Sequence, residues 1–241
     1  MTTTRHAPAA HCPVRLARSP GLPAGPRTVL LIALGTVLLL GALALAAWPT
    51  RGGLFERAAG GTAGSSLAGF AGLVADKGLL ALVAATGCLV LFTWLRDRPR
   101  FWLLAAAGVG TVGAYAVSEM VKLLVTEARP CHVVDVATVL ACPAPGDWSW
   151  PSNHSTIAGA LAVACLLVAP RLWPVVLPLA LAVAGARVAA GVHYVHDVAS
   201  GLALGVLVTT LVGVGLHAAA QRVTRRSTSR RSPGARRTTG R

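Results

Sequence analysis

The sequence is poor in charged residues, and above all in acids. Charged residues make up 12% of the 241 positions, about half the share usual in a soluble globular domain. Asp and Glu number 8 against 22 Lys and Arg, giving a net charge of +14, while 54% of the residues are apolar. This apolar content excludes a disordered chain, and a nucleic-acid binder with a pI near 11.4 would not explain it. Apolar segments in lipid, with charge confined to loops and tails, explain both facts.

Cysteine is also sparse and lacks a metal-binding spacing. The five cysteines are scattered, and no two form a Cys-x-x-Cys pair. Cys131 and Cys142 share one polar loop, where they can form a disulfide in an oxidising compartment or remain two free thiols. The sequence leaves both states open.

The apolar runs predict an all-α polytopic membrane protein, a bundle of six transmembrane helices. A span of about 20 apolar residues crosses the hydrocarbon core, and residues 28–48 contain no charge. This first run exceeds the core of a cleavable signal peptide, which is the competing interpretation. The predicted spans are 28–48, 78–95 (or from 67), 101–125, 154–169, 172–190 and 198–219. They form a 28–219 membrane domain, which we expect to be flanked by a disordered tail over 1–27 and a basic tail over 220–241.

Lys and Arg are unevenly divided between the two predicted sides of the membrane. With both termini in the cytoplasm, the cytoplasmic segments hold 16 of these cations and the outer segments hold six. We therefore expect a multi-pass protein of the cytoplasmic membrane with both termini inside. The basic tail is interpreted as a determinant of this orientation, attracted to anionic lipid, and nucleic acid is not an expected partner.

Polar residues from distant segments collect at the outer ends of the predicted spans. They are Lys122 and Arg129 around the end of the third span, Ser152, Asn153 and His154 at the start of the fourth, Arg187 at the end of the fifth, and His193 and Asp197 before the sixth. Ionisable groups in such places are functional candidates by default. We predict that they form one site at the outer face.

The residue types in this set suit a phosphate ester. Lys122, Arg129 and Arg187 can neutralise the phosphate oxygens, and arginine offers a fork that matches them. Lys122 is one of only two lysines in the chain. A helix that starts at Ser152 adds free N–H groups and the positive end of a helix dipole. A metal would need clustered carboxylates, which the pattern lacks, so we predict a site with neither metal nor other cofactor.

His193 and Asp197 are four positions apart, so they share a face if the segment is helical. A carboxylate on one imidazole nitrogen fixes the tautomer and leaves the other nitrogen free to attack. His193, His196 and Asp197 can also be read as a metal cluster, but no further ligand is placed to close it. We expect Glu119 to pair with Lys122 or to face the bundle.

Three motifs at these positions resemble the signature of the phosphatidic acid phosphatase type 2 superfamily, which includes membrane lipid phosphatases and soluble vanadium haloperoxidases. They are Lys122-x6-Arg129-Pro130, Pro151-Ser152-Asn153-His154 and Arg187-x5-His193-x3-Asp197. The resemblance implies that His193 is phosphorylated and that His154 protonates the leaving oxygen and then activates water. Two departures are Asn153, where the family usually has Gly, and Ala186, where it usually has Ser. The first narrows the phosphate pocket or adds a donor, and the second removes a hydroxyl.

Together these features predict a membrane lipid-phosphate phosphatase that opens on the extracytoplasmic side. Its substrate would be a phosphomonoester or pyrophosphate of a lipid, such as a polyprenyl diphosphate, phosphatidic acid or phosphatidylglycerol phosphate. The sequence does not choose among these lipids, and it does not indicate an oligomeric state. Two alternatives remain: a phosphotransferase that passes the phosphoryl group from His193 to an acceptor other than water, and a non-catalytic transporter or scaffold for anionic lipid.

Overall fold

The computed structural model describes the backbone of residues 25–230 and the side chains through residue 224, and this part of the chain contains helices and no strands. The elements are α1 (Pro26–Ala47), α2 (Arg51–Ala63), α3 (Ala68–Arg96), α4 (Arg98–Val125), α5 (Pro130–Val133), α6 (Asn153–Val168), the 3₁₀ turn η1 (Pro170–Leu172), α7 (Trp173–Ala189) and α8 (Val195–Arg230). The predicted all-α class is confirmed, and the six predicted spans correspond to α1, α3, α4, α6, α7 and α8.

Five helical segments in residues 25–230 are long and apolar enough to cross a membrane, by length and composition. They contain α1, α3, α4, α7 and α8. The sixth, α6, has 16 residues and rises about 24 Å, somewhat less than the roughly 30 Å of a hydrocarbon core. The count of six transmembrane helices therefore stays a prediction.

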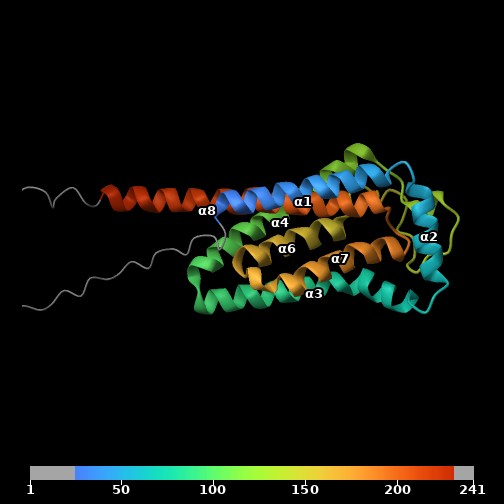
Figure 1. Ribbon diagram of the computed structural model, residues 1–241, viewed down its shortest axis with the longest axis horizontal. Helices are drawn as coiled ribbons and strands as arrows, with labels where there is room; N and C mark the ends of the chain where they lie inside the picture. The colour runs from blue at the N-terminus through green and yellow to red at the C-terminus, as the bar shows by residue number, and fades with distance from the viewer. Residues whose placement is uncertain (1–24, 231–241) are drawn as a thin grey trace, which may run out of the picture.

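The short helix α6 lies at the centre of the bundle, where it contacts α3, α4, α7 and α8. Ten of its 16 residues are buried, whereas α1 buries only Ala47 and runs along α8 (Figure 1). A helix enclosed by protein needs little contact with lipid, which is consistent with its shorter length.

Glycine allows α6 and α8 to pack with their backbones in contact. A Cβ atom at Gly205 would lie 2.1 Å from the carbonyl oxygen of Thr156, and one at Gly159 would lie 2.8 Å from that of Leu202. Small residues at such crossings are what allows helices to approach closely within a membrane. The start of α6 is thereby held against the first turns of α8.

α1 begins and α8 ends toward the same end of the bundle, and α2 crosses the opposite end beside the loop 126–152 (Figure 1). That loop is closed by a Cys131–Cys142 disulfide, which decides between the two states left open by the sequence. α8 continues through Arg230, so it enters the segment predicted as a basic tail from residue 220. The predicted disorder of 1–27 fails at Pro26 and Arg27, which are helical, while residues 1–24 lie outside the described part.

Candidate active site

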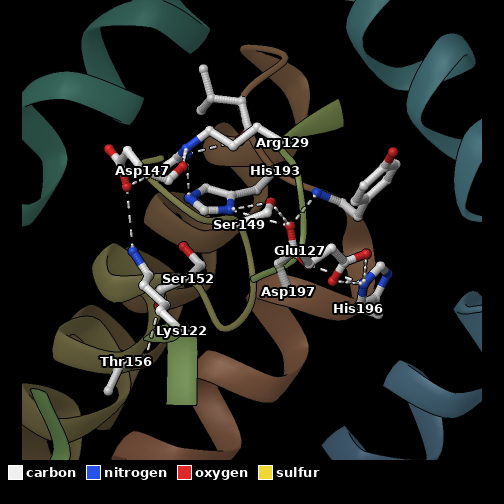
Figure 2. A network of polar contacts seen from close by, with 12 residues as sticks. Lys122, Glu127, Arg129, Asp147, Ser149, Ser152, Thr156, His193, His196 and Asp197 are labelled. Carbon is white, nitrogen blue, oxygen red and sulfur yellow. Dashed lines mark hydrogen bonds and ion pairs between the residues drawn. The ribbon is translucent and has the colours of Figure 1, made fainter. Parts of the chain in front are cut away.

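The predicted site residues come together at the end of the bundle that α2 covers. The end of α4, the start of α6, the end of α7 and the start of α8 meet there with the loop 126–152 (Figure 1). The side chains of six predicted residues are buried there: Lys122, Arg129, Ser152, Arg187, His193 and Asp197. Figure 2 shows five of them in one polar network. Burial of so many charged groups is costly unless they are paired or are kept for a ligand.

The His193 imidazole is held between a guanidinium and a carboxylate. Its Nε2 atom lies 3.0 Å from Arg129 Nη1, and its Nδ1 atom lies 3.2 Å from Asp197 Oδ2. Arginine only donates, so Nε2 must present its lone pair and Nδ1 must carry the proton that Asp197 accepts. Burial lowers the pKa of His193 to about 4, against the opposing effect of Asp197. The ring is therefore neutral at physiological pH, with its basic nitrogen facing Arg129.

Asp197 is fully buried, and its Oδ2 atom accepts two further hydrogen bonds. Ser149 Oγ donates to it at 2.5 Å and the backbone N–H of Tyr194 at 2.8 Å. Ser149 Oγ also lies 3.3 Å from His193 Nδ1. These contacts fix the carboxylate and, with it, the tautomer and direction of the imidazole ring.

Asp147 bridges two of the predicted phosphate-binding cations. Its Oδ1 atom lies 2.9 Å from Arg129 Nη2 and 3.6 Å from Lys122 Nζ, and its carbonyl oxygen accepts from Arg129 Nε at 2.8 Å. Partial burial raises the pKa of the Asp147 carboxyl, but the hydrogen bond and charge of Arg129 and the charge of Lys122 outweigh it, so the pKa falls below its usual value. Half of this side chain is exposed. The ionised Asp147 carboxylate thus lies between Arg129 and Lys122, and its exposed side has space for the carboxylate to move away from them.

Arg187 is the least compensated cation of the site. It is 8% exposed, its Nη1 atom donates to the carbonyl of Ala75 at 3.2 Å, and its Nε atom has no partner. Among residues 25–224 it forms no ion pair. A buried guanidinium without a carboxylate is unfavourable unless an anion completes it.

The start of α6 offers further donors to an anion. Ser152 occupies the N-cap position without a side-chain capping bond, and its buried hydroxyl has no partner. Its backbone N–H donates to the carbonyl of Asp197 at 3.1 Å, which ties α6 to α8. His154 follows in the first turn, half-buried, where the charges of Arg187, Arg129 and Lys122 all act on its imidazole.

Asn153 is directed at α4 in this structure. Its amide nitrogen donates to Glu119 Oε1 at 2.5 Å, and its amide oxygen accepts from Ser118 Oγ at 2.7 Å. Glu119 also lies 3.7 Å from Lys122 Nζ, in agreement with the expected pairing. Both ends of the Asn153 amide are therefore occupied, and its contact with phosphate remains a prediction.

Three residues of the network were not predicted: Glu127, Asp147 and Ser149. All three lie in the loop 126–152, whose path cannot be inferred from residue periodicity. One signal was available, because acids are rare in this chain and two of the eight fall on this loop within the site. The sequence suggests that His193, His196 and Asp197 could form a metal cluster with no further ligand. In the structure, Glu127 and not His193 groups with His196 and Asp197, and its carboxylate lies 3.2 Å from His196 Nε2.

The helical arrangement is similar to that of a solved membrane protein. A solved structure of a transmembrane PAP2 type phosphatidylglycerolphosphate phosphatase from Bacillus subtilis matches it with a TM-score of 0.50 at 20% identity, covering 78% of this chain and 93% of that one. At that identity the match shows the fold alone. Residues 103–219 match the model of the PAP2 superfamily, so this multi-pass chain is similar to that superfamily over somewhat under half of its length.

Two curated relatives match about half of the chain or less. A decaprenylphosphoryl-5-phosphoribose phosphatase from Mycobacterium tuberculosis is 38% identical over 120 residues, which is 49% of this chain and 63% of that protein. An undecaprenyl-diphosphatase from Sulfolobus acidocaldarius is 36% identical over 98 residues, 40% of this chain and 47% of that protein. The matched region thus spans about half to somewhat under two thirds of these relatives' own length.

Proposed function

We propose that the protein is a metal-independent lipid-phosphate phosphatase that acts through a phosphohistidine on His193. The observation that carries this proposal is the neutral His193 ring, whose Nε2 lone pair faces Arg129 while Asp197 accepts from Nδ1. A nucleophile needs such a fixed lone pair, and a phosphate ester needs the cations around it. The unpaired Arg187 and the free Ser152 hydroxyl add donors suited to the phosphate oxygens.

The proposed reaction has two displacement steps. His193 Nε2 forms a bond to phosphorus while the bond to the leaving oxygen breaks, and His154 gives that oxygen a proton. Water then attacks phosphorus, His154 takes its proton, and the P–N bond breaks to restore the His193 lone pair. Lys122, Arg129 and Arg187 would neutralise the phosphoryl oxygens in both steps. Arg129 would turn its N–H from Nε2 to the incoming phosphate.

The substrate class and the orientation belong to the same proposal. The named relatives act on polyprenyl-linked compounds, which supports a polyprenyl phosphate or diphosphate over a phosphoglyceride. An oxidised Cys131–Cys142 pair fits an oxidising compartment. Together with the charge bias, it supports a site on the extracytoplasmic side of the cytoplasmic membrane and both termini inside.

The test is phosphate release by the full chain in detergent. Undecaprenyl diphosphate, undecaprenyl phosphate, phosphatidic acid and phosphatidylglycerol phosphate would each be supplied with and without EDTA, beside the His193→Ala variant. We expect release by the wild type that EDTA leaves unchanged and His193→Ala abolishes. Equal, background release by both proteins on every substrate would contradict the proposal and favour a transporter or scaffold. Loss of phosphate from the donor lipid that requires an added alcohol acceptor would favour the phosphotransferase.

A further inference from the structure

Glu127 and His196 lie on the side of Asp197 that faces away from His193 (Figure 2). His196 Nε2 is 3.1 Å from Asp197 Oδ1 and 3.2 Å from each carboxylate oxygen of Glu127. His196 is 1% exposed and the Glu127 side chain 14%. Neither is needed by the proposed phosphoryl transfer, so this buried pair is unexplained by the reaction steps themselves.

The contacts assign the proton of the His196 ring. Three carboxylate oxygens surround Nε2, and a carboxylate accepts but does not donate, so Nε2 carries the hydrogen. The other ring nitrogen, Nδ1, is buried and has no partner in the described residues. Asp197 Oδ1 likewise receives no hydrogen bond of good geometry. Its one polar side-chain contact among residues 25–224 is His196 Nε2, at 3.1 Å. The two oxygens of Asp197 thus face opposite sides: Oδ2 accepts hydrogen bonds from groups around His193, and Oδ1 lies 3.1 Å from His196 Nε2.

The position of the His196 ring is set by aromatic neighbours. The Trp48 ring, just after α1, contacts the His196 ring edge-on, with 4.5 Å between the ring centroids. The Tyr194 ring stacks on the His196 ring with a centroid distance of 5.2 Å and an interplanar angle of 16°. Glu127 is fixed as well, because its carbonyl accepts from the backbone N–H of Ser149 at 2.8 Å. These contacts leave the imidazole little freedom, as a group that orients another requires.

We propose that Glu127 and His196 form a positioning pair that orients the Asp197 carboxylate, and through it the His193 imidazole, for attack on phosphorus. Glu127 accepts from the His196 N–H, and the same edge of the imidazole lies 3.1 Å from Asp197 Oδ1. This inference rests on the proposed phosphatase function. When His193 forms its bond to phosphorus, positive charge develops on its ring, and a carboxylate already in place stabilises that charge without rearranging. The pair touches no substrate, so its removal lowers kcat more than it changes KM.

The test compares two substitutions at one position. His196→Phe removes the N–H and keeps an aromatic ring for Trp48 and Tyr194, whereas His196→Gln restores a side-chain N–H. We expect His196→Phe to lower kcat by about 10- to 100-fold, the size typical of an outer orienting partner, with KM changed less than about twofold. His196→Gln should recover most of the loss. His217→Phe is the matched control, because His217 also lies on α8 but pairs with Gln221 away from the site.

Glu127→Gln provides a second variant that preserves shape should His196→Phe fail to fold. It should lower kcat about tenfold, and its loss should not add to that of His196→Phe, since both act through one contact. Wild-type kcat in both variants, or a loss that His196→Gln does not recover, would overturn the positioning role while the wild type still releases phosphate. A wild type inactive on every lipid phosphate would instead remove the proposed function.

Metal analysis of the purified wild type completes the test. The Nε2 of His196 and the carboxylates of Glu127 and Asp197 are close enough together to share one ion. We expect no stoichiometric metal. About one equivalent of a transition metal, lost in Glu127→Gln, would overturn the positioning pair and assign the three side chains to a metal centre.

Discussion

The two ends of the bundle differ in polarity, although many of the same helices form both. At the α2 end, the helices α4, α7 and α8 and the loops beside them bury six ionisable side chains: Lys122, Arg187, His196 and Asp197 from the helices, and Arg129 and His193 from the loops. Towards the end where α1 begins, α1, α6, α7 and α8 instead line an apolar cavity of about 400 Å³. Nearly all of its lining is aliphatic or aromatic, including Ile32, Leu167 and Trp173.

The two ends differ in whether their buried groups need polar partners. Charged groups can be buried at the α2 end because each of them except Arg187 has a charged or strongly polar partner. The apolar end needs no such partners, so it can keep open space without leaving a polar group unsatisfied. Catalysis is therefore expected to depend sharply on single residues at one end and weakly on those at the other.

After the complete loss expected from His193→Ala, the largest effect on activity is expected from Arg187→Met. This change removes the buried guanidinium that lacks an ion-pair partner in residues 25–224, and with it a donor suited to the transferring phosphoryl group. We expect kcat/KM to fall about 10²- to 10³-fold. Arg171→Met, which removes an exposed arginine at the opposite end, is the matched control and should change activity little. Equal losses in the two variants would show that general surface charge, and not the site, attracts the lipid.

Low pH should reduce both stability and activity through His193, at the α2 end. The pKa of His193 is lowered by burial to about 4, below the roughly 6.5 of an unfolded histidine. The unfolded state therefore binds more protons between these values, so stability falls as the pH drops from about 6.5 to 4. Activity should follow the same group: the acid limb of kcat/KM, calculated for the substrate species present, should lie near pH 4. A limb near 6.5 would contradict a buried, neutral nucleophile.

Much of this comparison could be predicted from the sequence. The apolar runs predict the long helices to within a few residues except at 67–78 and beyond 219. The motifs identify Lys122, Arg129 and His193 as neighbours. α2 was not predicted, because its Gly-rich, polar composition is not typical of a helix. It is stabilised by Phe55, which is fully buried against Tyr194. The contributions of Asp147 and Ser149 could not be predicted either, since they depend on how an irregular loop folds back over the helix ends.

A smaller effect is expected from Asp147→Asn. The half-exposed carboxylate occupies Lys122 and Arg129, so an anionic substrate must compete with it. Removing its charge should lower KM by about two- to fivefold, the strength typical of a partly exposed ion pair. Asp135→Asn, on the same loop but exposed, should leave KM unchanged. A raised KM in Asp147→Asn would show that the carboxylate organises the two cations instead of competing for them.

The smallest effect is expected from filling the apolar cavity. Ala33→Leu places a larger side chain into space lined by α1, α6, α7 and α8. Hydrolysis of a short-chain lipid phosphate should change less than about twofold, because no polar group of the network lies there, and surface or lining changes of this size are usually well tolerated. A tenfold loss of activity in the same assay would show that the apolar end and the polar end are coupled.

The backbone contact between α6 and α8 sets how much sequence variation each part of the protein can accept. No side chain stands between Gly205 and the carbonyl of Thr156, so no rotamer change can make room for a larger residue there. The lipid-facing surfaces of α1 and α3 carry no such restriction and can exchange one apolar residue for another. In a library of random variants, functional chains should therefore keep glycine at 159 and 205 while α1 varies. The separation of the two proposed catalytic histidines, His154 and His193, would then be preserved by residues that have no proposed role in the chemistry.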